Sequence, residues 1–184
     1  MTFKERWNIF SIGILIAAGL WIILTSIFSG AGTVIPTVAA REGFLAPEIE
    51  LDTLEGEAVQ LSSLKGQVVI VNFWASWCSP CRIEMPAIQK IYATYHDLGV
   101  EVLAVNTTNQ DDPGNVGQFV SERGLTFPIL LDYEGAVARR YAVRALPTTY
   151  IVGKDGIIQK MLIGGPLPEA LLSSQIEQLI GEER

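Results

Sequence analysis

The chain has 184 residues, which is enough for one well-packed domain and an accessory segment. Its formal net charge of −7 makes nucleic acids and anionic lipid surfaces poor partners. Its two cysteines are too few for a disulfide framework or a four-cysteine zinc site. Hydrophobic residues reach 49% and the mean hydropathy is +0.32, which is high for a protein with no part in a membrane.

The apolar excess is concentrated near the N-terminus. Residues 9–28 are 20 apolar or small residues, which at roughly 1.5 Å per residue span a hydrocarbon core about 30 Å thick. Lys4 and Arg6 precede this segment and no charge follows it before Arg41, so the positive-inside rule places residues 1–8 in the cytoplasm. We expect a single-pass membrane protein with its main domain extracytoplasmic, either periplasmic or on the outer face. A cleaved signal peptide is the alternative, although its apolar core is usually only about 7 to 15 residues long.

Residues 29–42 are rich in small residues and lack periodicity, as expected of a linker. We therefore assign residues 43–184 to one domain. At its start, two short stretches at 49–51 and 58–61 flank a turn and predict a hairpin.

Alternating strands and helices are predicted from residue 67 onward. A β-branched apolar run at 67–74 is typical of a strand buried on both faces. Apolar residues at near-helical spacing, among them Ile83 and Met85, then predict a helix over 79–97. The remaining pattern predicts strands at 100–106 and 128–131, helices at 112–123 and 134–141, a hairpin of strands 148–152 and 157–163, and a final helix at 167–180. This order favours an α/β fold with a mixed sheet.

The sequence Cys78-Ser79-Pro80-Cys81 stands at the start of the predicted helix 79–97. Two cysteines at this spacing can close into a disulfide and open again, as reversible two-electron exchange requires. The first lies where unpaired N–H groups and the helix dipole favour a thiolate, so we predict Cys78 as the nucleophile and Cys81 as the resolving thiol. The alternative is a copper or zinc site, for which His96 is the only histidine, near the far end of the helix.

Residues 68–86 resemble the active-site strand and helix of the thioredoxin superfamily. More narrowly, the W-C-x-x-C motif, the L-S-S-L-K-G turn and the later Leu146-Pro147-Thr148 resemble the membrane-tethered TlpA/ResA-type reductases of bacteria, over nearly all of 43–181. The resemblance implies a thioredoxin-like fold, a mixed central sheet flanked by helices, with an N-terminal hairpin and a central αβ insertion. We place that insertion at 100–123.

The same resemblance implies a substrate surface beside the cysteines. Pro147 would follow a cis peptide bond, and Leu146 would expose backbone groups that align an incoming peptide as an extra strand. We expect Trp77 to shape the rim of this surface. The arginines at positions 139, 140 and 144 precede the Pro147 loop and either attract an acidic partner or form a solvated helix face.

One position departs from thioredoxin, which carries a buried, proton-transferring aspartate where Asn72 stands. Asn72 cannot titrate. Reductases of the ResA type have a glutamate matching Glu84, which lies about one helical turn beyond Cys81. We assign Glu84 an acid–base or pKa-tuning role, and a surface glutamate is the alternative.

Together these features predict an extracytoplasmic thiol-disulfide oxidoreductase that reduces protein disulfides through the Cys78–Cys81 pair, without a bound cofactor or metal. By resemblance, the substrate would be the heme-attachment cysteines of apocytochrome c, and electrons would come from a membrane thiol carrier of the CcdA/DsbD kind. The alternatives are a disulfide-forming oxidase, distinguished by its redox potential, and a copper-binding assembly chaperone.

Overall fold

The computed structural model describes residues 15–23 and 37–181. The chain divides into two units, Met1–Ile35 and Pro36–Arg184. Within the segment 9–28 predicted to cross a membrane, residues 15–23 form a helix and the others lie outside the described residues. No helix among the described residues is long and apolar enough to cross a membrane.

The second unit includes residues that we assigned to the linker. Val38 forms a parallel bridge with Leu45, and the Glu42 Oε1 atom accepts a hydrogen bond from the Met161 N–H at 3.0 Å. Small residues without periodicity predict a linker, but a single short bridge leaves no periodic signal in the sequence. The fold therefore includes residues from about 37 onward.

The predicted N-terminal hairpin is present. Strand β1 (Glu50–Asp52) pairs with β2 (Ala58–Gln60) in an antiparallel two-stranded sheet. A short 3-10 helix (Leu61–Leu64) follows it. Thr53 forms a bridge with Leu130, so the hairpin covers one edge of the main sheet.

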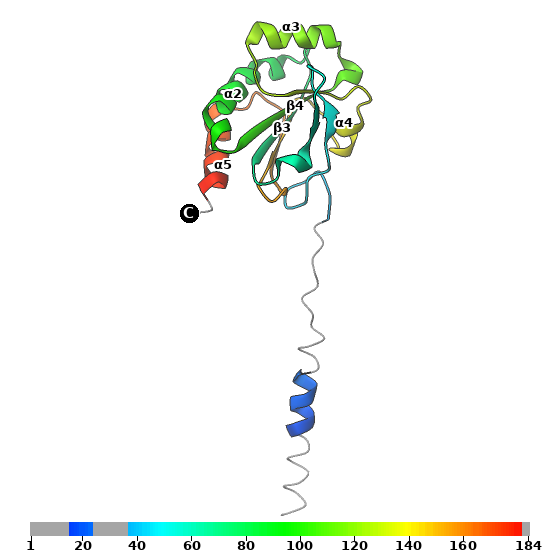
Figure 1. Cartoon of the computed structure of the whole chain (residues 1–184), viewed down its shortest axis with the longest axis vertical. Coiled ribbons are helices and arrows are strands. Elements are labelled where there is room, and N and C mark those ends of the chain that lie inside the picture. Colours follow the sequence, from blue (N-terminus) through cyan, green and yellow to red (C-terminus); the bar gives the residue numbers. More distant parts are fainter. Residues whose placement is uncertain (1–14, 24–36, 182–184) are drawn as a thin grey trace, which may run out of the picture. The chain divides into compact units, whose positions relative to one another are not determined.

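The main sheet has five strands in the order β5-β4-β3-β6-β7 (Figure 1). Strands β3, β4 and β5 are parallel, whereas β6 is antiparallel to β3, and β7 to β6. The strand bounds are β3 Val68–Trp74, β4 Val100–Asn106, β5 Ile129–Leu131, β6 Thr148–Val152 and β7 Ile158–Ile163. Every residue of β3 is buried, which confirms the prediction of a central strand covered on both faces.

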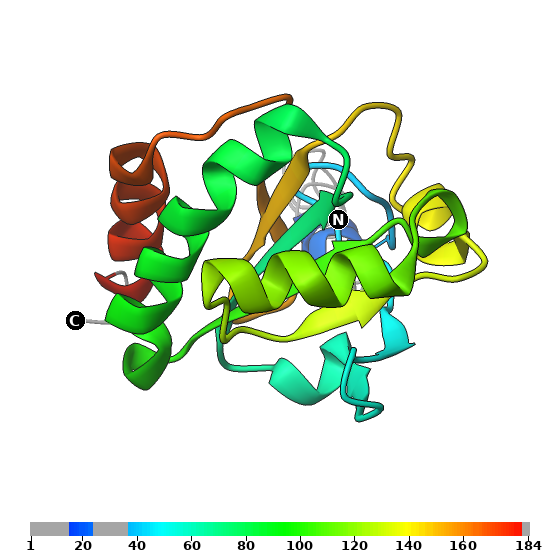
Figure 2. The ribbon, with the colours of Figure 1, turned by 90° about the horizontal axis from the view of Figure 1, so that it is seen from above.

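Helices cover both faces of this sheet. One face carries α2 (Ser79–Tyr95), α3 (Pro113–Arg123) and α5 (Glu169–Gly181), with α2 and α5 side by side (Figure 2). The other face carries the short α4 (Ala136–Arg140) and residues of the N-terminal hairpin region. A second 3-10 helix (His96–Leu98) extends α2. The mixed sheet flanked by helices confirms the thioredoxin-like fold.

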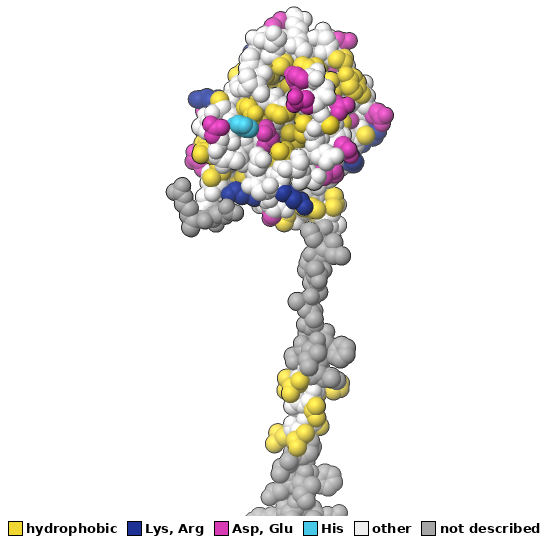
Figure 3. Space-filling view, in the orientation of Figure 1, with side chains coloured by type: hydrophobic (Ala, Val, Ile, Leu, Met, Phe, Trp, Pro, Cys, Tyr) yellow, Lys and Arg dark blue, Asp and Glu magenta, His cyan; other side chains and the backbone are white. Residues whose placement is uncertain are grey.

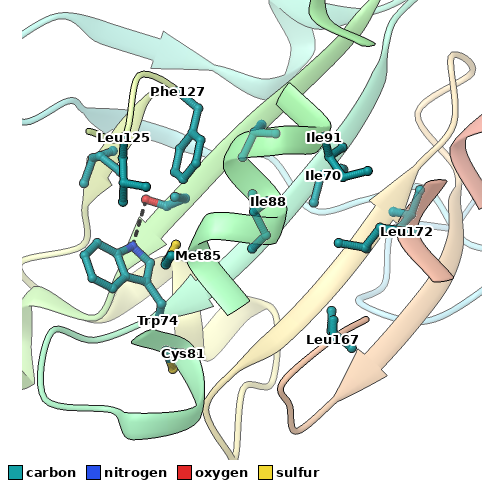
Figure 4. Close-up of a cluster of buried hydrophobic side chains, with 14 of the residues drawn as sticks. Ile70, Trp74, Cys81, Met85, Ile88, Ile91, Leu125, Phe127, Leu167 and Leu172 are labelled. Carbon is teal, nitrogen blue, oxygen red and sulfur yellow. Dashed lines mark hydrogen bonds between the residues drawn. The ribbon is translucent and has the colours of Figure 1, made fainter. Parts of the chain in front are cut away.

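Alternation along β3 produces two apolar cores. Ile70 and Trp74 face the α2 side, where they pack with Met85 and Ile88, and the Trp74 indole N–H donates to the Ala104 carbonyl at 3.4 Å (Figure 4). Val71 and Phe73 of β3 face the opposite core, around α4. Full burial of each such side chain contributes about 1.5–3 kcal/mol, so the burial of β3 on both faces stabilises the domain.

Two sequence expectations need correction. Strand β4 lies in the interior of the sheet, so the peripheral αβ unit consists of α3 and the edge strand β5 rather than residues 100–123. On α2, Ile83 is 61% exposed, although its apolar character predicted a place on the core face. Glu84 is buried there instead, because the buried face of α2 runs through Cys81, Glu84 and Met85.

Candidate active site

The cysteines lie just beyond the carboxyl end of β3, where α2 begins. Cys78 is the N-cap of α2, Pro80 lies in its first turn, and Cys78 and Cys81 form a disulfide with a Cα–Cα distance of 5.3 Å. The Cys81 N–H points at the Cys78 Sγ atom, 3.3 Å away. Cys78 is 5% exposed and Cys81 is fully buried, so an incoming sulfur can reach only Cys78.

The loop before Cys78 is held by a carboxylate that sequence reasoning missed. Asp111 accepts hydrogen bonds from the Ser76 N–H and the Ser76 hydroxyl, both at 2.6 Å, and from the Asn106 side chain at 2.9 Å. Burial alone would raise the pKa of Asp111, but these hydrogen bonds outweigh it and hold the pKa below its ordinary value of 3.8. A signal was present, because the loops after the parallel neighbours β3 and β4 meet at one edge of the sheet.

Replacing Asp111 by asparagine is expected to lower the free energy of unfolding by about 1–3 kcal/mol at neutral pH, since charged hydrogen bonds to Ser76 are lost. A lowered pKa stabilises the fold above the ordinary pKa and loses that effect as the pH falls through the folded-state value. The difference from wild type should therefore shrink below about pH 4. Urea unfolding at several pH values measures it.

Asp112→Asn is the matched control for this prediction. Asp112 caps α3 by accepting from the Gly114 and Asn115 N–H groups, and asparagine caps a helix about as well as aspartate. Equal destabilisation by Asp111→Asn and Asp112→Asn would contradict a special role for Asp111.

A groove of about 400 Å³ runs past Cys78. Trp77, which is 59% exposed, lines the groove, and its indole N–H donates to the Gln110 carbonyl at 2.8 Å. Leu146 and Arg144 also line the groove. The Leu146–Pro147 peptide bond is cis, as the resemblance implies, and Pro147 is buried behind Leu146. The fold thus brings together Trp77, Cys78 and the Pro147 loop.

Glu84 lies inside the protein, so the alternative of a surface glutamate is wrong. Its side chain accepts hydrogen bonds from the Asn72 amide at 2.9 Å and from the Leu167 N–H at 3.1 Å. Burial raises the pKa of Glu84, and these two hydrogen bonds only partly oppose the increase. Asn72 also donates to the Thr149 hydroxyl at 2.8 Å, while its own Oδ1 atom is buried without a partner among the described residues.

Glu84 and Pro147 meet at a glycine. A Cβ atom at Gly165 would lie 2.6 Å from the Glu84 Oε2 atom and 2.7 Å from the Pro147 Cγ atom. Only a residue without a side chain fits between them. Gly165 and Leu167 were missed from the sequence because they lie more than 80 residues beyond Glu84 in the chain and carry no recognisable motif. Thr149 directly follows Leu146-Pro147-Thr148, but its contact with Asn72 spans 77 positions and was not predicted.

His96, the remaining candidate metal ligand, lies outside this site. His96 ends α2, with its ring 4.6 Å from that of Tyr92 and its Nδ1 atom 3.7 Å from Glu101 Oε2. In the described part of the chain, no group of three or more His, Cys, Asp or Glu side chains is arranged to hold a metal ion.

A thioredoxin-like sheet with a Cys-x-x-Cys disulfide at the start of its central helix defines a thiol-disulfide oxidoreductase. The sequence pattern of the AhpC/TSA family matches residues 43–161, and the chain belongs to that family.

Relatives support the same class. The chain is 40% identical over 126 residues to the thiol-disulfide oxidoreductase ResA of Geobacillus thermodenitrificans, a match covering 68% of this chain and 71% of that protein. It is 44% identical over 128 residues to the thioredoxin-like protein YneN of Bacillus subtilis, covering 69% and 74%. The crystal structure of a putative thiol:disulfide interchange protein DsbE from Chlorobium tepidum matches with a TM-score of 0.71 and 32% identity, covering 77% of this chain and 99% of that one.

Proposed function

We propose that the protein reduces disulfides of extracytoplasmic proteins, with Cys78 as the nucleophile and Cys81 as the resolving thiol. The observation that carries this proposal is the asymmetry of the pair, because Cys78 lines the groove and Cys81 lies fully buried behind it. The N-cap position of Cys78 supports it further, since helix N–H groups and the dipole stabilise a thiolate there.

The reaction begins with the protein in the dithiol form. The Cys78 thiolate attacks one sulfur of the substrate disulfide, which forms a mixed disulfide and releases the other substrate sulfur as a thiolate. The Cys81 thiolate then attacks Cys78 Sγ and displaces the second substrate sulfur. Two electrons have moved to the substrate, and the protein is left as the Cys78–Cys81 disulfide. A dithiol donor must reduce it before the next cycle.

Glu84 is proposed to exchange the proton of Cys81. It follows Cys81 by three residues on the same buried face of α2, and side chains at this spacing are neighbours. Its raised pKa lies closer to neutral pH than that of an ordinary glutamate, so the carboxyl group is better able both to donate and to accept a proton there. Burial behind the disulfide keeps this exchange away from bulk water.

The substrate is proposed to lie across the groove, with Trp77 at its rim and the Leu146–Pro147 segment alongside. Leu146 precedes β6 without belonging to it, so its backbone groups are placed to pair with an extended peptide as in strand addition. The disulfide is the redox group, and the mechanism needs no further cofactor.

The cellular location and membrane topology of the protein are proposed from its N-terminal segment. Residues 9–28 would anchor the chain in the cell membrane with residues 1–8 in the cytoplasm and the redox domain outside. That arrangement holds the domain near a membrane thiol carrier of the CcdA/DsbD kind, which would supply electrons. The heme-attachment cysteines of apocytochrome c are the proposed substrate.

The redox potential tests the direction of electron flow. A value of about −200 mV or lower, with reduction of insulin disulfides by the dithiol form, supports a reductase, whereas a value near −120 mV indicates a disulfide-forming oxidase. Copper titration of the reduced protein is the second measurement. Tight stoichiometric binding that is lost in Cys78→Ser, without insulin reduction by wild type, would indicate a copper-binding chaperone instead.

A further inference from the structure

The groove beside Cys78 contains one charge. Among the described residues that line it, Arg144 alone has a charged side chain, and the others are apolar or neutral. Arg144 is exposed and makes no hydrogen bond or ion pair with any described residue. By contrast, Arg82 donates to the Ser76 carbonyl and Arg139 to the Glu134 carbonyl. The Arg144 guanidinium is therefore available to a molecule in the groove.

Within the described part of the chain, no carboxylate lines the groove to neutralise Arg144. Asp111 follows the lining residue Gln110, but its two oxygens are occupied by Ser76 and Asn106. Arg144 lies four residues before β6 and two before Leu146, so it stands on the same segment that would align a substrate peptide. A side chain next to the substrate's cysteine would thus come close to Arg144.

The chain beyond the N-terminal segment has a net negative charge. Residues 1–28 contain two basic and one acidic residue, so the remainder of the chain carries a net charge of −8, and acidic side chains are spread over the face shown in Figure 3. At physiological ionic strength charges are screened over about 8 Å. A peptide in the groove therefore interacts with Arg144 more strongly than with those distant carboxylates.

We infer that Arg144 determines substrate specificity by selecting protein segments that carry an acidic side chain next to the reactive cysteine. This inference rests on the proposed function and names the substrate class of the same groove. The carboxylate of the substrate pairs with the guanidinium, which offers a planar pair of donors for it. The pair positions the substrate sulfur near Cys78 without changing the exchange chemistry.

The test uses the full chain in the dithiol form and three synthetic peptides. Each peptide carries a disulfide to the same chromophoric thiol, and they differ only in having Glu, Gln or Lys beside the cysteine. Because a neighbouring charge changes the intrinsic reactivity of a disulfide, each rate is divided by the rate of the same peptide with dithiothreitol. Exposed ion pairs change affinity by up to about fivefold. Wild type should therefore show kcat/KM about threefold lower for Gln than for Glu, and about tenfold lower for Lys.

Arg144→Gln should remove this preference, and Arg144→Glu should favour the Lys peptide. Arg140→Gln is the matched control, since Arg140 is an exposed arginine at the end of α4, four residues before Arg144, and does not line the groove. It should keep the wild-type order, and the order should weaken as salt is added.

Two outcomes would overturn the inference. One is an unchanged Glu-to-Lys ratio in Arg144→Gln. The other is an equal slowing of all three peptides together with a shifted pH profile for Cys78 alkylation, which would mean that Arg144 acts on the thiolate. Failure of the proposed function has a different signature, because then no peptide is reduced by any variant.

Discussion

A Cys81→Ser variant should accumulate a covalent mixed disulfide between Cys78 and the substrate protein. Removing the buried thiol leaves the first exchange intact and prevents the second, since serine cannot attack Cys78 Sγ. Turnover with insulin should then fall to the background rate. The complex is measured on non-reducing gels after the membrane fraction is treated with the variant, and mass spectrometry of the trapped partner identifies the substrate.

Cys78→Ser is the control for this trap. It keeps Cys81, but that thiol is fully buried, so it should form no mixed disulfide and show no turnover. Alkylation of the reduced wild type should modify Cys78 well before Cys81. Trapping by Cys78→Ser at the rate of Cys81→Ser would reverse the two roles.

Glu84→Gln should reduce kcat/KM for disulfide reduction by about 10- to 100-fold, because a positioned proton donor and acceptor is lost. It should also shift the pH dependence of thiol alkylation to lower pH, since an ionised carboxylate beside Cys81 disfavours a thiolate. The rates are measured from pH 5 to 9 with iodoacetamide, which reports on the thiols without requiring turnover.

Stability gives an independent readout for Glu84. Its pKa is raised from 4.5 by burial, so the folded state binds this proton more tightly, and wild type loses stability as the pH rises from the ordinary pKa through the folded-state value. Glu84→Gln should lack that loss. Glu122→Gln, an exposed glutamate on α3, is the control. Unchanged alkylation and turnover profiles in Glu84→Gln would leave Glu84 with a purely structural role.

The parts of the fold that depend on local patterns could be predicted from the sequence. The apolar run of β3 indicated its central place, and Asp112-Pro113 marked the start of α3, where Asp112 accepts from two N–H groups. The spacing and helix position of Cys78 and Cys81 were equally local. Each depends on residues that lie close together in the chain, so a single sequence contains the signal.

Several hydrogen bonds around the active site join residues far apart in the chain, and no local pattern predicted these contacts. Asp111 reaches Ser76 across 35 positions, and Leu167 reaches Glu84 across 83. The burial of Glu84 could have been inferred from its position, because it stands three residues after Cys81 and one before Met85 on a single helix face. The charge of its side chain argued against that inference, since isolated carboxylates are rarely buried.

The contact between Leu167 and Glu84 affects how freely the sequence can vary. Its donor is a backbone N–H, so exchanging the leucine for another residue keeps the hydrogen bond, and only proline at this position removes it. The neighbouring Gly165 is the reverse case, because any Cβ there collides with Glu84 and Pro147. The Leu167 side chain is buried in the core on the α2 side, so among homologues position 167 should vary among apolar residues while position 165 remains glycine, although both adjoin the same carboxylate.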